Sequence, residues 1–210
     1  MTIKGIIFDL DGVLLSTDEF HYLAWKKLAD KLNIPFDKEK NNRLRGVSRM
    51  ASLEIVLEGY SFTEEQKIAF AEEKNNTYRN LLATLTPDIV SADVRNTLKK
   101  LKERGYKLAI GSSSKNTKFI LEKVELINEF DAIADGNDIK NSKPDPEVFL
   151  KAAEKLGLSP KDCLVVEDAE AGIDAGNNGG FTTVGIGIAS NYAKARYKIN
   201  ILSDILNLTI

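Results

Sequence analysis

Two aspartates separated by one residue follow an apolar run near the start of the chain, in Ile6-Ile7-Phe8-Asp9-Leu10-Asp11-Gly12-Val13. Side chains alternate along an extended segment, so Asp9 and Asp11 are expected on the same side of a strand end. Like charges held this close repel each other, and a desolvated pair tends to keep a proton. The pair favours a hard cation such as Mg²⁺, or a nucleophilic carboxylate beside one that carries protons. The alternative is a polar turn whose aspartate caps the next helix.

A second acidic pair, Glu167-Asp168, follows the apolar run 163–166. Ligands of parallel sheets bind at the carboxyl ends of the strands, so this pair could join Asp9 as oxygen ligands of Mg²⁺. Taken alone, two acids before a helix are equally typical of a helix N-terminus, where the helix dipole favours negative charge.

A serine and a lysine follow two more apolar runs. Ser112 comes directly after the run 107–111, and Lys143 lies in the polar loop after the next run. A hydroxyl and an ammonium suit the oxygens of a phosphoryl group, whose transfer depends mainly on positioning and electrostatics. Each alone is also typical of a polar turn or a solvated lysine. Their joint occurrence favours phosphoryl transfer, with Asp9 as the attacking group and Asp11 as the proton donor to the departing oxygen.

Apolar, β-rich runs that alternate with helical patterns must position these side chains. Such alternation predicts a parallel sheet with helices on both faces. The expected strands are 3–8, 107–111, 131–135, 163–166 and 182–186. The expected helices are 92–104 capped by Ser91, a helix capped by Asp145 that ends near Gly157, 169–178, and a short one near Asp204. The sequence therefore predicts an α/β fold with a doubly wound, Rossmann-like parallel sheet.

A helical insert separates the first two strands. We interpret residues 17–85 as a helical cap domain inserted into a core of residues 1–16 and 86–210. Asp18 is expected to cap the first helix, and Thr63 with Gln66 forms a capping box for the last one. Between them we expect a loop at 44–49 and a helix that stops at Gly59. Helices without a strand suit a separate bundle, and the alternative is extra helices packed on the side of the core.

The composition excludes several classes of function. The chain has 210 residues, 43% hydrophobic content, one cysteine and a net charge of −2. This charge gives no general attraction to nucleic acid or to an anionic membrane. No run is long and apolar enough to span a bilayer, and the start of the chain lacks the pattern of a secretory signal. We therefore expect a cytoplasmic protein with no nucleic-acid or membrane partner, and a monomer.

These motifs together resemble the haloacid-dehalogenase-like superfamily. The matching motifs are Asp9-Leu10-Asp11-Gly12-Val13, Ser112, Lys143-Pro144 and Glu167-Asp168-Ala169-Glu170-Ala171-Gly172. The resemblance implies that Asp9 is the phosphorylated nucleophile and Asp11 the general acid and base. It also implies that Ser112 and Lys143 contact the phosphoryl group, and that Mg²⁺ is held by Asp9, Asp11, Glu167 and Asp168.

The insert is similar to that of the β-phosphoglucomutase branch of the superfamily. His21 and Trp25 lie four residues apart on one helix face, and Thr17 lies at the hinge. The resemblance implies catalytic roles for Thr17 and His21. It implies substrate contacts for Asp11, Trp25, Gly46, Val47, Ser48, Arg49, Ser52, Lys74, Ser113, Ser114, Lys115 and Asn116. Without this context, His21 reads as a surface residue, Trp25 as packing, and Lys74 as a solvated partner of the neighbouring glutamates.

The implied enzyme is an intramolecular phosphotransferase of the isomerase class, a phosphomutase. It would interconvert β-D-glucose 1-phosphate and glucose 6-phosphate through an aspartyl phosphate on Asp9 and a 1,6-bisphosphate. Its expected partners are Mg²⁺, a sugar phosphate and a bisphosphate activator. Two alternatives stay open. One is a Mg²⁺-dependent hexose-phosphate phosphatase, and the other is a non-catalytic sugar-phosphate sensor, which would not need Asp11.

Overall fold

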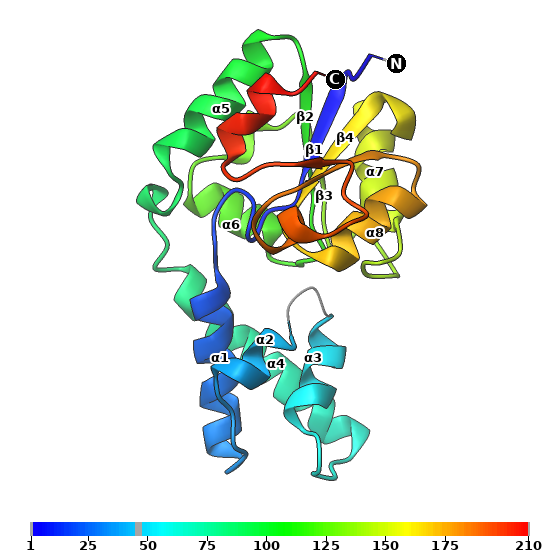
Figure 1. The fold of residues 1–210 in the computed structure, drawn as a ribbon. Coiled ribbons are helices and arrows are strands. Elements are labelled where there is room, and N and C mark those ends of the chain that lie inside the picture. Colours follow the sequence, from blue (N-terminus) through cyan, green and yellow to red (C-terminus); the bar gives the residue numbers. More distant parts are fainter. Residues whose placement is uncertain (1, 45–47, 210) are drawn as a thin grey trace. The chain divides into compact units, whose positions relative to one another are not determined.

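The computed structural model describes residues 2–44 and 48–209 and divides into two compact units. The first unit joins Met1–Ser16 to Thr86–Ile210, and the second is Thr17–Leu85. Figure 1 shows the strands gathered in the first unit and the helices α1 to α4 in the second. The fold class predicted from the sequence, a parallel α/β sheet with an inserted helical segment, is confirmed.

The sheet of the first unit has six parallel strands in the order β3-β2-β1-β4-β5-β6. The strands are β1 (Gly5–Phe8), β2 (Lys107–Gly111), β3 (Ala132–Ala134), β4 (Cys163–Glu167), β5 (Thr182–Gly185) and β6 (Tyr197–Lys198). The strand order reverses beside β1, and open α/β sheets bind ligands outside the carboxyl ends at such a switch point. The edge strand β6 was not predicted, because two partly exposed residues carry no apolar signal.

Helices cover both faces of this sheet, with α5 and α6 on one side and α7 and α8 on the other (Figure 1). The helices are α5 (Ala92–Glu103), α6 (Thr117–Lys123), α7 (Glu147–Leu156) and α8 (Glu170–Asn178). Alternate strand residues, among them Ile7, Ala109 and Val165, pack against Val148 and Phe149 of α7. Burial on both faces explains why these strands read as continuous apolar runs.

Short 3₁₀ helices connect the main elements of the first unit. They are Pro87–Ile89, Ile127–Glu129, Pro160–Asp162, Gly187–Asn191 and Leu202–Asn207. The last of these corresponds to the short helix expected near Asp204.

The cap predicted for α7 is shifted by one residue. The cap position is Pro146 rather than Asp145. The Asp145 carboxylate nevertheless accepts a hydrogen bond of 2.9 Å from the Glu147 amide, so it satisfies a free N–H group of the first turn as a capping aspartate does. The cap predicted for α5 is confirmed, since Ser91 Oγ accepts from the Val94 amide.

The second unit contains α1 (Asp18–Lys31), α2 (Lys38–Asn42), α3 (Arg49–Val56) and α4 (Glu64–Leu82). Its apolar core includes Trp25 and Leu28 of α1, Leu53 and Val56 of α3, and Ala71 of α4. The capping box of Thr63 and Gln66 at the start of α4 is confirmed. No described helix combines the length and the apolar character that crossing a membrane requires.

Two expectations for the second unit are wrong. Asp18 does not cap α1, because it is the first helical residue, and Thr17 at the cap position makes no side-chain capping bond. Arg49 does not lie in the loop expected at 44–49. Ser48 is the N-cap of α3, with its Oγ accepting from the Ala51 amide, and Arg49 opens the helix. The helix α2, which was not predicted, is capped by Asp37.

Candidate active site

The two acidic motifs meet at the carboxyl ends of neighbouring strands. Phe8 of β1 pairs with Val166 of β4, so Asp9 and Glu167 occupy the next position on each strand. The Asp9 amide donates a hydrogen bond of 3.0 Å to the Val166 carbonyl, which extends the pairing by one residue. Both acids are therefore fixed by the sheet itself rather than by a loop.

Lys143 links these two carboxylates although it lies far from both in the sequence. Its Nζ lies 2.6 Å from Asp9 Oδ1, contacts Glu167 Oε1, and stands 4.7 Å from the centre of the Phe149 ring. The side chain is only 7% exposed. Burial by itself lowers the pKa of Lys143, but the Asp9 and Glu167 carboxylates raise it more, so the net pKa lies above its ordinary value. The ammonium therefore keeps its charge and orients the Asp9 carboxylate.

Asp9, Glu167 and Asp168 form a cluster that fits a divalent cation. One carboxylate oxygen from each residue lies within 4.8 Å of the others. Burial, followed by the charges of Glu167, Asp9 and Asp11, raises the pKa of Asp168 to about 8. Three carboxylates beside one ammonium leave an excess of negative charge, and all the donors are hard oxygens of the kind that Mg²⁺ prefers. The residues present therefore fit Mg²⁺.

Asp11 does not belong to this cluster among the described residues, although the sequence analysis counted it among the metal ligands. The reason lies in the backbone. After Asp9 the chain leaves the sheet, and Asp11 forms a bridge with Leu15 in the turn that follows. The side chain of Asp11 is partly exposed, which suits a group that exchanges protons.

Two glycines let the chain pass close to these acids. A Cβ atom on Gly12 would lie 2.1 Å from Asp168 Oδ2, and Gly12 has a φ of +86°, in the left-handed region that favours glycine. A Cβ atom on Gly172 would lie 2.0 Å from Glu167 Oε1. Both motif glycines are thus required by the space that the carboxylates occupy.

The serine motif lies at the end of β2, the neighbour of β1 on its other side. Ser112 is buried, and its Oγ accepts a hydrogen bond of 3.3 Å from the Ser114 amide. Ser114 Oγ in turn accepts from the Asn116 amide at 3.2 Å. Lys115 is exposed, and the buried Ser113 hydroxyl has no hydrogen-bond partner among the residues that the structure describes. The side chains of this loop thus shape its own backbone.

A second polar cluster lies within the helical unit, between α1 and α4. Lys74 Nζ lies 2.8 Å from His21 Nδ1 and 4.7 Å from the ring centres of both Trp25 and Tyr78. Lys74 is 3% exposed, so the expectation of a solvated ion pair is wrong. Cation–π contacts with these two rings stabilise the buried charge. Trp25 is itself buried in the apolar core, and it supports the Lys74 ammonium.

His21 is neutral in this cluster. Burial, followed by the positive charges of Lys74 and Arg49, holds the pKa of His21 well below its ordinary value. A neutral ring whose Nδ1 accepts from the Lys74 ammonium carries its proton on Nε2.

Tyr78 completes the cluster and was not singled out from the sequence. Its hydroxyl lies 2.8 Å from Thr17 Oγ1, and its ring stacks on His21 with a centroid distance of 4.0 Å. The available signal was its position four residues after Lys74, which places both side chains on one face of α4.

The remaining residues predicted to bind substrate come from the start of α3. Ser52 is buried, and burial lowers the pKa of the Arg49 guanidinium from its ordinary value. Gly46 and Val47 lie outside the described residues.

Comparisons with known proteins identify the family of the chain. A family model described as haloacid dehalogenase-like hydrolase matches residues 3–180. The chain is 40% identical to a β-phosphoglucomutase of Bacillus subtilis (strain 168) over 206 residues, which are 96% of this chain and 91% of that protein. It is 29% identical to a phosphorylated carbohydrates phosphatase of Thermotoga maritima over 186 residues, 86% of this chain and 83% of that protein.

A crystal structure of β-phosphoglucomutase from Clostridium difficile has the same fold, with a TM-score of 0.90 and 40% sequence identity. The match covers 97% of this chain and 93% of that one, so it includes both units. With the family model matched over residues 3–180 and 40% identity to a β-phosphoglucomutase over 96% of its length, this chain is an enzyme that belongs to the haloacid dehalogenase-like hydrolase family.

Proposed function

We propose that this enzyme is a β-phosphoglucomutase, which interconverts β-D-glucose 1-phosphate and glucose 6-phosphate. The observation that supports this most is the 40% identity to a β-phosphoglucomutase over 96% of the chain, because it includes the helical unit as well as the core. Within this family the core motifs alone do not distinguish a mutase from a phosphatase.

In the proposed reaction, the phosphoryl group of an aspartyl phosphate on Asp9 passes to the 6-hydroxyl of β-glucose 1-phosphate. Asp11 removes the proton from that hydroxyl. The resulting 1,6-bisphosphate then reorients in the site, which brings its other phosphoryl group to Asp9. Asp9 then attacks the phosphorus at the 1-position, and Asp11 returns the proton to the departing oxygen. This releases glucose 6-phosphate and restores the phosphorylated enzyme, so atoms and charges balance over the cycle.

The core residues assist this exchange in ways that their contacts support. Lys143 orients Asp9 through Oδ1 and reduces its repulsion toward an anionic phosphorus. Ser112 would donate its hydroxyl proton to a phosphoryl oxygen. Asp9, Glu167 and Asp168 would hold Mg²⁺, which supplies positive charge to the transferring group when it is bound.

We propose that the helical unit binds the second phosphate of the substrate. A substrate with two anionic groups requires a second cationic site, and Arg49 and Lys74 supply charge on that unit. The neutral His21 is held by Lys74, and Thr17, the first residue of the helical unit, is held by Tyr78. We further propose that a 1,6-bisphosphate activates the enzyme and that the enzyme is a monomer in the cytoplasm.

The test compares two products from one assay. The protein is supplied with β-glucose 1-phosphate, Mg²⁺ and a catalytic amount of the 1,6-bisphosphate, and both glucose 6-phosphate and free phosphate are measured. We expect isomerisation to exceed phosphate release, and Asp9→Asn to abolish it. Asp88→Asn makes the same chemical change at an exposed position outside the site and serves as the control. Full isomerisation by Asp9→Asn would refute the role of Asp9.

A hexose-phosphate phosphatase is the second candidate, favoured by the 29% identity to a phosphatase of phosphorylated carbohydrates. The two functions share Asp9 and differ in whether water or a sugar hydroxyl accepts the phosphoryl group. Phosphate release without isomerisation in the same assay would establish the phosphatase instead.

A further inference from the structure

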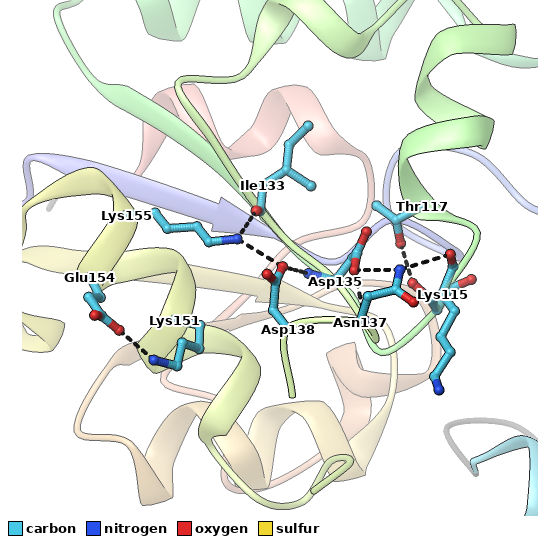
Figure 2. A network of polar contacts seen from close by, with 10 residues as sticks. Lys115, Thr117, Ile133, Asp135, Asn137, Asp138, Lys151, Glu154 and Lys155 are labelled. Atoms are coloured by element: carbon cyan, nitrogen blue, oxygen red, sulfur yellow. Dashed lines mark hydrogen bonds and ion pairs between the residues drawn. The ribbon is translucent and has the colours of Figure 1, made fainter. Parts of the chain in front are cut away.

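A buried aspartate that the proposed reaction does not use lies at the end of β3. Asp135 is 1% exposed. Its Oδ1 accepts two hydrogen bonds from Asn137, at 2.8 Å from the backbone amide and 3.0 Å from Nδ2 (Figure 2). Its Oδ2 is buried without a hydrogen-bond partner among the described residues. Burying a carboxylate is costly, so its presence needs an explanation.

Residues 136 and 137, which directly follow Asp135, contact the backbone of the loop after β2. Asn137 Nδ2 donates to the Lys115 carbonyl at 3.2 Å, as Figure 2 shows, and the Gly136 amide donates to the Ser114 carbonyl at 3.1 Å. The two backbones lie so close that a Cβ atom on Gly136 would be 2.3 Å from the Ser113 carbonyl oxygen. Three consecutive residues of the loop after β2, Ser113 to Lys115, are therefore contacted from one side; residues 112–116 are called the serine loop below.

The same segment is anchored to α7 on its other side. Asp138 Oδ2 accepts from the Asp135 amide at 2.9 Å and from Lys155 Nζ at 2.8 Å. Lys155 Nζ also donates to the Ile133 carbonyl at 2.7 Å. Figure 2 shows this continuous path from α7 through Asp138 and Asp135 to Asn137 and Lys115. The serine loop is thus tied to a helix of the core and does not depend on its own short turns alone.

We propose that Asp135 and Asn137 are positioning residues for the sugar-phosphate substrate. Asp135 orients Asn137, and Asn137 fixes the carbonyl of Lys115, so that the backbone of Ser113 to Asn116 is set before substrate arrives. The proposal rests on the proposed function for the role of this loop in binding a sugar phosphate. It requires that substrate binding depends on the pair, while phosphoryl transfer at Asp9 does not.

The experiment combines hydrogen exchange with steady-state kinetics. Asn137→Ala removes the bond to Lys115 at an exposed position, so folding is retained. We expect faster amide exchange in residues 113–117 of the ligand-free protein. We also expect KM for β-glucose 1-phosphate to rise roughly threefold to tenfold, the range for one lost hydrogen bond, with kcat changed less than about twofold. Asp135→Ala should do the same, and the double variant should be no worse than Asp135→Ala, because both changes break one path.

Two further variants separate positioning from a loss of stability. Asp135→Asn keeps an oxygen that accepts from Asn137, so KM should return toward the wild-type value. Lys151→Ala removes the exposed ion pair with Glu154 on α7 and a weaker electrostatic interaction with Asp138, keeps every hydrogen bond of the path, and should leave both readouts unchanged. Leu101→Ala, on the buried face of α5, serves as a destabilised control and should lower the melting temperature without raising KM.

The outcomes are distinct from those that test the proposed function. Faster exchange together with a raised KM supports the inference, whether the wild-type enzyme isomerises its substrate or only releases phosphate. Unchanged exchange in Asn137→Ala and Asp135→Ala overturns it, and so does faster exchange with an unchanged KM. A wild-type protein without isomerase activity would refute the proposed mutase function. The hydrogen-exchange result would still show whether Asp135 and Asn137 order the loop after β2.

Discussion

Proton release on Mg²⁺ binding is the sharpest consequence of the acidic cluster. The perturbation is pH, varied from 6 to 9 on the metal-free protein. With a pKa of about 8, roughly one tenth of the Asp168 side chains are ionised at pH 7 and about one hundredth at pH 6. A cation needs the ionised form, so the apparent affinity for Mg²⁺ should rise about tenfold per pH unit up to pH 8 and level off above it. At pH 7, binding should release about 0.9 proton from Asp168.

The same pKa shift predicts an effect on stability with a definite sign. The folded protein keeps a proton on Asp168 that the unfolded chain loses above its ordinary pKa of 3.8. Without Mg²⁺, this group should therefore lower the free energy of unfolding as pH rises from about 4 to about 8. Bound Mg²⁺ stabilises the ionised form and should remove that loss.

Isothermal titration calorimetry with Mg²⁺, in pairs of buffers that differ in ionisation enthalpy, measures both the affinity and the protons released. Asp168→Asn removes the titrating group and should bind Mg²⁺ weakly with little dependence on pH. Asp162→Asn, outside the cluster, should behave as the wild type. An affinity that is constant between pH 6 and pH 8, with no proton release at pH 7, would refute the reasoning.

Three substitutions test other parts of the two units. Lys143→Ala leaves two buried carboxylates without their cation, so it should abolish turnover and lower the free energy of unfolding by about 3–5 kcal/mol in the absence of Mg²⁺. Urea denaturation measures this loss, and unchanged stability would contradict the pairing. Gly12→Ala places a methyl group against Asp168 and strains the backbone, so calorimetry should record weaker Mg²⁺ binding; wild-type affinity would mean that this close approach does not matter. Tyr78→Phe removes the bond to Thr17 and keeps the ring against Lys74, so it should cost about 1 kcal/mol in the same denaturation assay, whereas a larger loss would point to a role beyond that bond.

The sheet could be predicted from the sequence because its strands are buried on both faces. Burial on both sides leaves a continuous apolar run, and each run ends where a chemically distinctive residue begins, as at Phe8-Asp9 and Val166-Glu167. Parallel pairing then requires the ends to lie at one edge. That is why the positions of Asp9 and Glu167 follow from local patterns although the two residues are 158 positions apart, the difference between 167 and 9.

The rest depended on contacts that no local pattern specifies. Lys74 follows two glutamates, which suggests a solvated charge, yet the rings of Trp25 and Tyr78 enclose it. The bond from Asn137 to Lys115 joins two loops whose sequences are merely polar. In both cases the partner is chosen by tertiary packing, and the sequence states only that the residue is able to make such a contact.

The placement of β1 at the centre of the sheet bears on how the nascent protein matures. Of the strands in this sheet β1 is synthesised first, but its two neighbours, β2 and β4, begin at Lys107 and Cys163. The segment Thr17–Leu85 is contiguous and forms a compact unit, so it can become compact while β1 still lacks both partners. β1 therefore stays unpaired until about half of the 210 residues, those up to β2, have been synthesised, and it gains its second neighbour only when β4 follows.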